Sequence, residues 1–222
     1  MSHASRLLMK EFVTHDVTAF FLTRPEGFTF DPGQAVTVAV DREGLRDSVR
    51  PFSPTSLPED ELLQLVIKRY EHHDGVTEAL HELEPGASLL VSEPFGTIGY
   101  RGKGTFIAAG AGITPFLPII RGLAKRGELA GHDLHFSNKT PADVIYEREF
   151  CSYFGDRAHF TCTREGGPLH DKRHIDRSYL KESIDDFGQQ FYVCGPPAFV
   201  KDVRANLGAL GAAEGRIVVE GT

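Results

Sequence analysis

The pattern of apolar residues changes close to residue 101, and this change constrains the fold more than any other feature of the sequence. From residue 104 onward, short apolar segments alternate with longer segments of helical spacing. This alternation predicts parallel strands, because parallel strands have to be joined by crossovers. The expected strands are residues 105–109, 133–137, 158–163, 191–194 and 216–219, and the expected helices are residues 114–125, 145–153, 176–183 and 198–210. A five-stranded parallel sheet of the α/β class is therefore expected.

The first hundred residues have a different pattern, in which short alternating runs are interrupted by turn residues such as Pro32-Gly33. A period of two predicts antiparallel strands. These strands are expected at residues 12–22, 35–40, 62–70 and 88–92. Thr77 is expected to cap one short helix over residues 77–83. The sequence thus predicts a small antiparallel β-barrel domain over residues 1–101, followed by the α/β domain over residues 102–222.

Composition and charge narrow the functional classes. The 222 residues carry a formal net charge of −7 and no run of Lys or Arg longer than two, so neither nucleic acid nor a membrane surface is an expected partner. The three cysteines, at positions 151, 162 and 194, suit neither a disulfide framework nor a zinc or iron–sulfur site. No apolar segment approaches the ~18 residues that cross a bilayer, and no export signal is recognised. A cytoplasmic protein is expected.

A turn of small residues joins the first parallel strand to its helix. Gly110 and Gly112 stand in this turn, and Pro115 would occupy the first turn of the helix. Glycines let a pyrophosphate approach the backbone, while the free amides and the dipole of a helix N-terminus attract its negative charge. Pro115 replaces the third glycine of the usual dinucleotide fingerprint. A strand–turn–helix without a ligand therefore stays an alternative.

A second turn, Cys194-Gly195-Pro196, ends another strand of the same sheet and opens a helix. Ligands of open parallel sheets bind at the carboxyl ends of the strands. This turn and the Gly110 turn are therefore expected to face one crevice. The alternative is a buried thiol at a strand end, followed by a helix that starts with proline.

A third motif, Arg50-Pro51-Phe52-Ser53, lies in the barrel half. The guanidinium of Arg50 suits a phosphate, Phe52 offers a planar face, and Ser53 offers one donor and one acceptor to a polar ring edge. Taken singly, each of these residues is also common on protein surfaces or in protein cores that bind no ligand. Their meaning depends on the other motifs.

Taken in their order along the chain, the three motifs resemble the ferredoxin–NADP reductase superfamily. The residues that extend the resemblance are Pro32-Gly33-Gln34, Gly75-Val76-Thr77, Glu93-Pro94-Phe95-Gly96 and Glu220. The match runs from about Pro32 to Glu220, and its order and spacing are more specific than any single motif. The resemblance implies a flavin-binding barrel followed by a pyridine-nucleotide domain.

For the barrel, the resemblance implies that Arg50 contacts the flavin phosphate, that Phe52 stacks on the isoalloxazine ring and that Ser53 forms a hydrogen bond near its N5 atom. Many relatives have Tyr where Phe52 stands, so one hydrogen bond to the cofactor is absent here. The other candidate flavin-binding residues are Pro51, Lys68, Arg69, Tyr70, Gly75, Val76 and Thr77. FAD is favoured over FMN by analogy with free-standing relatives.

For the second domain, the candidate nucleotide-binding residues are Gly110, Gly112, Thr114, Pro115, Ser137, Asn138, Lys139, Cys194, Gly195 and Pro196. The resemblance places Cys194 beside the nicotinamide rather than in the role of a nucleophile, and it gives Glu220 a part in proton or hydride traffic. Ser53, Cys194 and Glu220 are thus the candidate catalytic residues. No acid follows the second parallel strand, where Lys139 stands instead, which favours NADPH and leaves NADH open.

The resemblance therefore implies a flavoenzyme that passes hydride from NAD(P)H to FAD and then electrons to a separate acceptor, such as flavodoxin, ferredoxin or another small acceptor. Two alternatives stay open: a nucleotide-sensing module without turnover, and an electron-transfer subunit of a multicomponent oxygenase. No metal site is expected. The segment His72-His73-Asp74 and the pair His170 and His174 are interpreted as exposed loop histidines, because no further ligands accompany them at fixed spacing.

Overall fold

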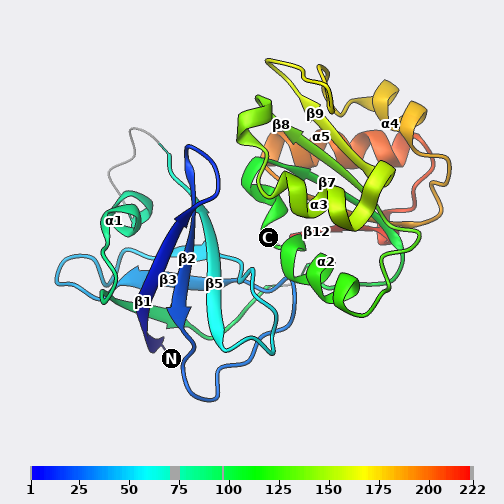
Figure 1. The fold of residues 1–222 in the computed structure, drawn as a ribbon. Helices are drawn as coiled ribbons and strands as arrows, with labels where there is room; N and C mark the ends of the chain where they lie inside the picture. Colours follow the sequence, from blue (N-terminus) through cyan, green and yellow to red (C-terminus); the bar gives the residue numbers. More distant parts are fainter. Residues whose placement is uncertain (1, 71–75, 97, 221–222) are drawn as a thin grey trace. The chain divides into compact units, whose positions relative to one another are not determined.

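The computed structural model describes residues 2–70, 76–96 and 98–220, which form two compact units (Figure 1). The first unit contains the described residues up to Gly99 together with Thr114–Arg121. The second contains Tyr100–Ile113 and the described residues from Gly122 onward. Helix α2, Phe116–Lys125, therefore begins within the first unit and ends within the second.

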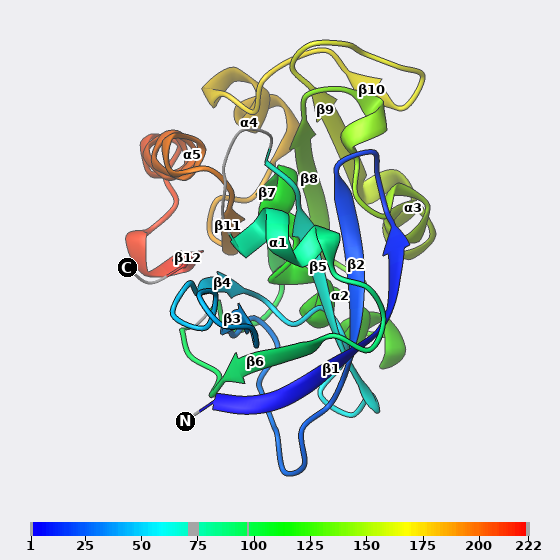
Figure 2. The ribbon, with the colours of Figure 1, turned by 90° about the vertical axis from the view of Figure 1, so that its left-hand side faces the viewer.

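Within the described residues, the first unit has six antiparallel strands. They are β1 (Ser2–Phe12), β2 (Val17–Thr23), β3 (Val36–Val40), β4 (Arg50–Phe52), β5 (Leu62–Lys68) and β6 (Ser88–Ser92). Their spatial order is β4-β3-β6-β1-β2-β5, and Figure 2 shows β6 between β3 and β1. The end strands approach each other at an isolated bridge between Pro54 and Leu65, so the sheet is a nearly closed barrel. The predicted antiparallel barrel is confirmed.

Alternate apolar side chains fill the interior of this barrel. Phe20 and Leu22 of β2 and Leu63 of β5 are at most 1% exposed, as a strand with one buried face requires. Helix α1 (Val76–Glu82) adds Val76 and Leu80 to the same core. Each large apolar side chain buried in this way contributes about 1.5–3 kcal/mol relative to an exposed one.

Some local predictions for this unit are wrong. The chain forms two strands, β1 and β4, where none was predicted, and a turn separates β1 from β2 within the predicted strand at residues 12–22. In β1 the pairing register shifts between Leu7 and Met9, which breaks the alternation that the prediction relied on. Helix α1 already includes Val76, so Thr77 lies inside the helix rather than capping it.

The second unit has a parallel sheet of six strands in the described residues, not the five that were predicted. These strands are β7 (Gly104–Ala109), β8 (Asp133–Asn138), β9 (Ala158–Cys162), β10 (His170–Asp171), β11 (Gln190–Cys194) and β12 (Ile217–Val219), in the spatial order β10-β9-β8-β7-β11-β12. The unpredicted strand, β10, has only two residues, which is too short to show a period of two. The predicted α/β class is confirmed.

Helices cover both faces of this sheet. Helices α4 (Arg177–Ser183) and α5 (Pro197–Ala209) share one apolar cluster with β7 and β11. Helix α3 (Glu147–Phe154) lies on the other face, where Phe150 meets Phe136 of β8 edge to face at 6.1 Å between ring centroids (Figure 1). None of the helices in the described part of the chain combines the length and the apolar character that crossing a bilayer requires.

A buried histidine lies beneath α4. His135 of β8 is 1% exposed, its ring stacks on His159 at 4.6 Å between centroids, and its Nδ1 shares a hydrogen bond of 2.7 Å with the hydroxyl of Tyr179. Burial, together with the charge of His159, lowers the pKa of His135 to about 3. The folded protein therefore holds this ring neutral at every pH above about 3.

We expect the free energy of unfolding to fall as the pH decreases from 6.5 toward 3. In this range the unfolded chain binds a proton at His135 and the folded chain does not, so the loss from this residue approaches about 1.4 kcal/mol per pH unit. In denaturant titrations at several pH values, the free energy of unfolding should depend less steeply on pH in His135→Phe than in the wild type. The exposed His174→Gln serves as the control, and an equally steep dependence in His135→Phe would contradict the assignment.

Candidate functional site

Two turns lie at the carboxyl ends of neighbouring strands in the second unit. Strand β7 runs into a 3-10 turn, Gly110–Ile113, in which Gly110 has a φ of +52°, and α2 follows. Strand β11 pairs with β7 in parallel, with Cys194 opposite Ala108, and leads through Gly195 into α5. The topology thus brings the two predicted turns to one edge of the sheet.

These two turns are in direct contact through their backbones. A Cβ atom built on Gly112 would lie 2.5 Å from the carbonyl oxygen of Cys194 and 2.6 Å from the Cα of Gly195. A Cβ on Gly195 would in turn lie 3.0 Å from the Cβ of Ala109. Only glycine fits at position 112. Because glycine has no side chain, this residue leaves the backbone amides of the turn accessible, as an approaching pyrophosphate requires.

The side chain of Cys194 is buried beside an acid. Burial, together with the charge of Glu220, raises the pKa of the Cys194 thiol to about 12. The thiol is therefore protonated at neutral pH, which makes it a poor nucleophile. A cavity of about 680 Å³ extends from Cys194 and Glu220 along α5 and β12, with an apolar lining that includes Val200 and Val219.

The end of β8 carries buried polar atoms without partners. Asn138 is 6% exposed, and neither its side-chain oxygen nor its nitrogen has a hydrogen-bond partner within the described residues. Ser137, one residue earlier, is 7% exposed, whereas Lys139 is exposed. An unsatisfied buried amide costs about 1–3 kcal/mol, so a polar ligand at this position would relieve a real penalty.

Sequence reasoning missed Arg164. The backbone N–H of Thr163 donates to the Asn138 carbonyl at 2.9 Å, and the N–H of Arg164 donates to the Lys139 carbonyl at 2.8 Å. The side chains of Lys139 and Arg164 are both exposed, and they follow the carboxyl ends of the neighbouring strands β8 and β9. The available signal was the position of Thr163-Arg164 directly after a predicted strand, as Lys139 follows the strand before it.

In the first unit, the Arg50-Pro51-Phe52-Ser53 motif forms β4 and the residue after it. Arg50 is exposed, its Nη1 donates to the neighbouring Val49 carbonyl at 2.8 Å, and no acidic partner is found for it among residues 2–70, 76–96 and 98–220. Phe52 is partly buried and packs against the barrel core, which leaves part of its ring accessible. An unpaired guanidinium next to a partly exposed ring suits a ligand with both a phosphate and a planar group.

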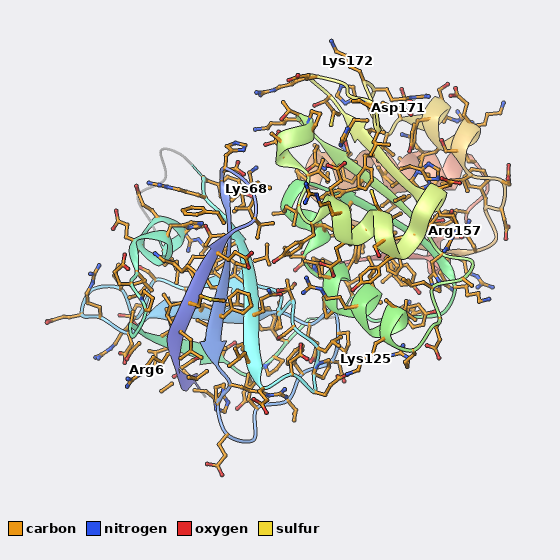
Figure 3. All side chains as sticks on the ribbon, in the orientation of Figure 1. Arg6, Lys68, Lys125, Arg157, Asp171 and Lys172 are labelled. Carbon is orange, nitrogen blue, oxygen red and sulfur yellow. The ribbon has the colours of Figure 1, made fainter. Side chains whose placement is uncertain are left out.

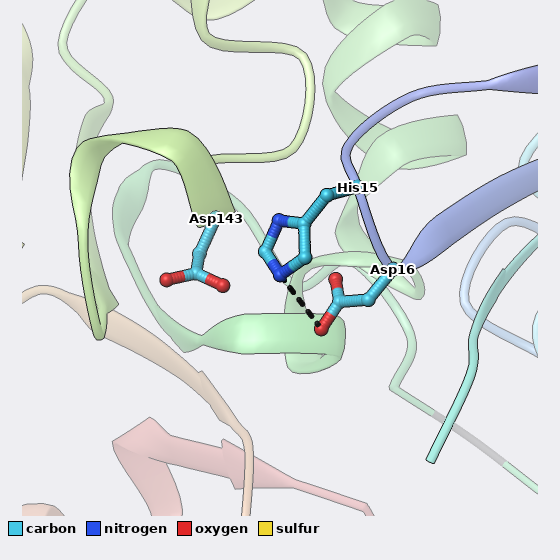
Figure 4. Close-up of side chains that lie close together, drawn as sticks. All are labelled: His15, Asp16 and Asp143. Carbon is cyan, nitrogen blue, oxygen red and sulfur yellow. Dashed lines mark ion pairs between the residues drawn. The ribbon is translucent and has the colours of Figure 1, made fainter. Parts of the chain in front are cut away.

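The other basic candidates of this unit are engaged in ion pairs. The Nζ of Lys68, labelled in Figure 3, lies 2.6 Å from the carboxylate of Asp16, and Arg69 lies 3.7 Å from Glu78. Although burial opposes it, the hydrogen bond and charge of Lys68 lower the pKa of Asp16. Figure 4 shows that His15 also pairs with Asp16, at 3.7 Å. Lys68 and Arg69 thus have acidic partners, whereas Arg50 has none in the described chain.

The remaining candidates of the barrel differ in their positions. Tyr70 is 54% exposed, Val76 is buried in the core and Thr77 lies in α1. Gly75, like His72-His73-Asp74, lies outside the described residues.

The interpretation of His170 as an exposed loop residue is wrong. This ring is 8% exposed, and its Nε2 lies 3.4 Å from the Glu147 carboxylate. His174 is exposed, as expected.

Two families of known proteins match successive parts of the chain. Residues 4–100 match the family described as the oxidoreductase FAD-binding domain, and residues 106–205 match the oxidoreductase NAD-binding domain. The chain thus contains an FAD-binding and an NAD-binding domain. The residues in both turns at the sheet edge, from Gly110 to Pro115 and from Cys194 to Pro196, fall within the second match.

Two curated proteins illustrate the sequence similarity. The ferredoxin–NADP reductase B of Sorangium cellulosum is 29% identical over 195 residues, which cover 81% of this chain and 79% of that protein. The ferredoxin–NAD(P)(+) reductase component of the naphthalene 1,2-dioxygenase system of Pseudomonas putida is 27% identical over 216 residues, which cover 90% of this chain. The chain spans 64% of the length of that reductase component.

Two solved structures share the fold. A ferredoxin NADP+ reductase from Neisseria gonorrhoeae, with FAD and NADP bound, superposes with a TM-score of 0.86 at 21% identity and covers 99% of this chain and 98% of its own. The flavohem-like FAD/NAD-binding domain of nitric oxide dioxygenase from Vibrio cholerae superposes with a TM-score of 0.85 at 23% identity. The superposition covers 98% of this chain and 97% of that domain.

The contact between the two turns predicts that Gly112→Ala is destabilising. The added methyl group meets backbone atoms, which cannot rotate away as a side chain can, so we expect a loss of about 1–3 kcal/mol in the free energy of unfolding. Gly208→Ala is the matched control, because Gly208 lies in α5 with nothing within 4 Å of an added Cβ and should gain about 0.5–1 kcal/mol. Equal stabilities of the two variants would contradict the turn–turn contact.

Proposed function

This chain belongs to the ferredoxin–NADP reductase superfamily, and on that premise we propose that it is a flavin-dependent NAD(P)H oxidoreductase. In this proposal residues 1–101 bind FAD, residues 102–222 bind NAD(P)H, and electrons leave to a separate small acceptor. When bound, the two cofactors supply the hydride and electron transfer, and the protein supplies binding, orientation and electrostatics. The observation that carries the proposal is the backbone contact between the Gly112 turn and the Cys194 turn at the carboxyl edge of the parallel sheet.

Each candidate residue then has a task that its surroundings support. The turn amides near Gly112, at the start of α2, attract the pyrophosphate of the nucleotide. The neutral thiol of Cys194 offers an uncharged surface beside the nicotinamide, and Glu220 places a carboxylate next to it. In the barrel, the unpaired Arg50 holds a phosphate, Phe52 stacks on the flavin ring and Ser53 fixes the polar edge of that ring.

The acceptor in this proposal is a small electron-transfer protein such as ferredoxin or flavodoxin. The Pseudomonas putida relative is named as a ferredoxin–NAD(P)(+) reductase component of a dioxygenase system, which supports an acceptor of this class. The same similarity supports the related proposal that the chain serves as the reductase component of an oxygenase. Co-purification of a second chain would favour that assignment over a free-standing reductase.

The visible spectrum of the purified protein tests the function. Without oxygen, we expect flavin bands that bleach when NADPH or NADH is added, because the nucleotide reduces the bound FAD. A protein that stays colourless after incubation with FAD and with FMN would overturn the proposal and leave a nucleotide-sensing module in its place. Release of the flavin by heat, followed by chromatography, separates FAD from FMN.

The pair of basic residues at the carboxyl ends of β8 and β9 supports NADPH as the coenzyme. We expect Arg164→Ala and Lys139→Ala each to raise the KM for NADPH about tenfold, which corresponds to about 1.4 kcal/mol, while the KM for NADH changes little. Steady-state kinetics with both nucleotides measure this difference. Arg126→Ala, which removes an exposed ion pair with Glu128, is the control, and parallel increases for both nucleotides would contradict the assignment.

A further inference from the structure

The seam of the barrel, where the end strands β4 and β5 meet, is held by side chains as well as by the backbone. Pro54 bridges Leu65, and the N–H of Thr55 donates to the Gln64 carbonyl at 2.8 Å. The hydroxyl of Thr55 donates to Oε1 of Gln64 at 2.8 Å, and the N–H of Gln64 donates to the hydroxyl of Ser56 at 3.1 Å. Thr55, Ser56 and Gln64 are all buried or nearly so, at 0%, 6% and 9% exposure.

One charged side chain from α2 enters this seam. The Nη1 of Arg121 donates to the Thr55 carbonyl at 2.7 Å and to Oε1 of Gln64 at 2.7 Å. Hydrogen bonds from a charged donor are roughly twice as strong as those between neutral groups. Because Oε1 of Gln64 accepts from both Thr55 and Arg121, the three residues form one connected network.

The beginning of α2 packs on the barrel at a second place. Residues 114–121 belong to the first unit. A Cβ on Gly33, which has a φ of +92°, would lie 2.0 Å from the Ile98 carbonyl oxygen and 3.3 Å from the Cδ1 of Ile119. The helix therefore touches the barrel through an apolar side chain and through Arg121. Both contacts lie within two turns of the start of α2 at Phe116.

From this network we propose that Arg121 is a positioning residue for the flavin-binding segment. Ser53 stands one residue before the Pro54 bridge and two before Thr55, so the charged clamp on Thr55 fixes the backbone from which the Ser53 side chain extends. Arg121 also follows the Gly110–Ile113 turn on the helix that this turn opens. One side chain thus ties the nucleotide-binding helix to the residue that orients the flavin. The inference rests on the proposed function.

The first test uses hydrogen exchange and needs no turnover. In Arg121→Met, the amides of Thr55 and Gln64 should exchange at least tenfold faster than in the wild type, while those of β7 and β8 in the second unit keep their rates. Arg126→Met on the turn after α2 is the control, because the side chain of Arg126 forms an exposed ion pair with Glu128. Unchanged exchange at Thr55 in Arg121→Met would overturn the clamp.

The second test separates positioning from a merely structural role by a double-mutant cycle. A displacement of ~1 Å at a reacting group can cost ~100-fold in rate, so we expect Arg121→Met to slow anaerobic flavin reduction by NADPH about tenfold, with FAD still bound and the KM for NADPH within twofold. In the Ser53→Ala background the same substitution should slow reduction less than twofold, because its effect passes through Ser53. Equal slowing in both backgrounds would overturn the proposal.

Arg121→Lys keeps the charge and the helix propensity, so it provides a measurement even where Arg121→Met does not fold. One ammonium cannot reproduce the planar fork, and we expect a loss of about threefold in the reduction rate. A rate equal to that of the wild type would contradict the requirement for a guanidinium. If the wild type binds no flavin, the proposed function fails; if it is reduced normally and the Arg121 variants match it, only this inference fails.

Discussion

The backbone of Gly112 lies against that of Cys194 and Gly195, and the arrangement of the candidate nucleotide-binding edge depends on this contact. The 2.5 Å separation between a hypothetical Cβ and the Cys194 carbonyl leaves no space for any other residue. With the two turns held together in this way, the amides after β7 and the thiol after β11 belong to one surface. A dinucleotide needs such a surface, since its pyrophosphate and its nicotinamide have to be held at a fixed separation.

Charge pairing divides the basic residues of the barrel into two groups. Lys68 is held by Asp16 and Arg69 by Glu78, whereas Arg50 has only a carbonyl partner in the described chain. A paired cation is partly neutralised and has to give up its partner before it can hold a phosphate. The resemblance assigned Arg50 to the flavin phosphate and named Lys68 and Arg69 as further flavin-binding candidates, and the structure distinguishes the three by their partners. Arg50 is therefore the strongest candidate for the flavin phosphate.

Much of the fold follows from sequence patterns, because in strongly periodic segments the spacing of the apolar residues shows which face of the strand or helix is buried. The strands and helices after residue 104 were predicted within a few residues of their observed bounds. The failures have local causes: the bulge in β1 interrupts the alternation at Leu7–Met9, and β10 is too short to have a period. The sequence motifs also identified the two turns that the structure brings into contact.

Other features of the site depend on tertiary contacts that no local pattern encodes. Arg121 stands in an apolar helix, where its charge gives no hint that it reaches Thr55. Arg164 is brought next to Lys139 only by the pairing of β8 with β9. His170 was interpreted from its loop context, but the packing of Phe160 and Glu147 around it buries the ring. Each of these residues gains its role from a neighbour distant in sequence.

The shortness of β10 has a consequence for how this protein behaves at high concentration. A parallel sheet exposes unpaired amides and carbonyls along its outermost strands, and a long free strand invites pairing with another chain. Here the outermost strands are β10, with two residues, and β12, with three. Both are too short for a long intermolecular ladder, so strand length alone limits edge-to-edge pairing at the two ends of this sheet as far as the structure describes it.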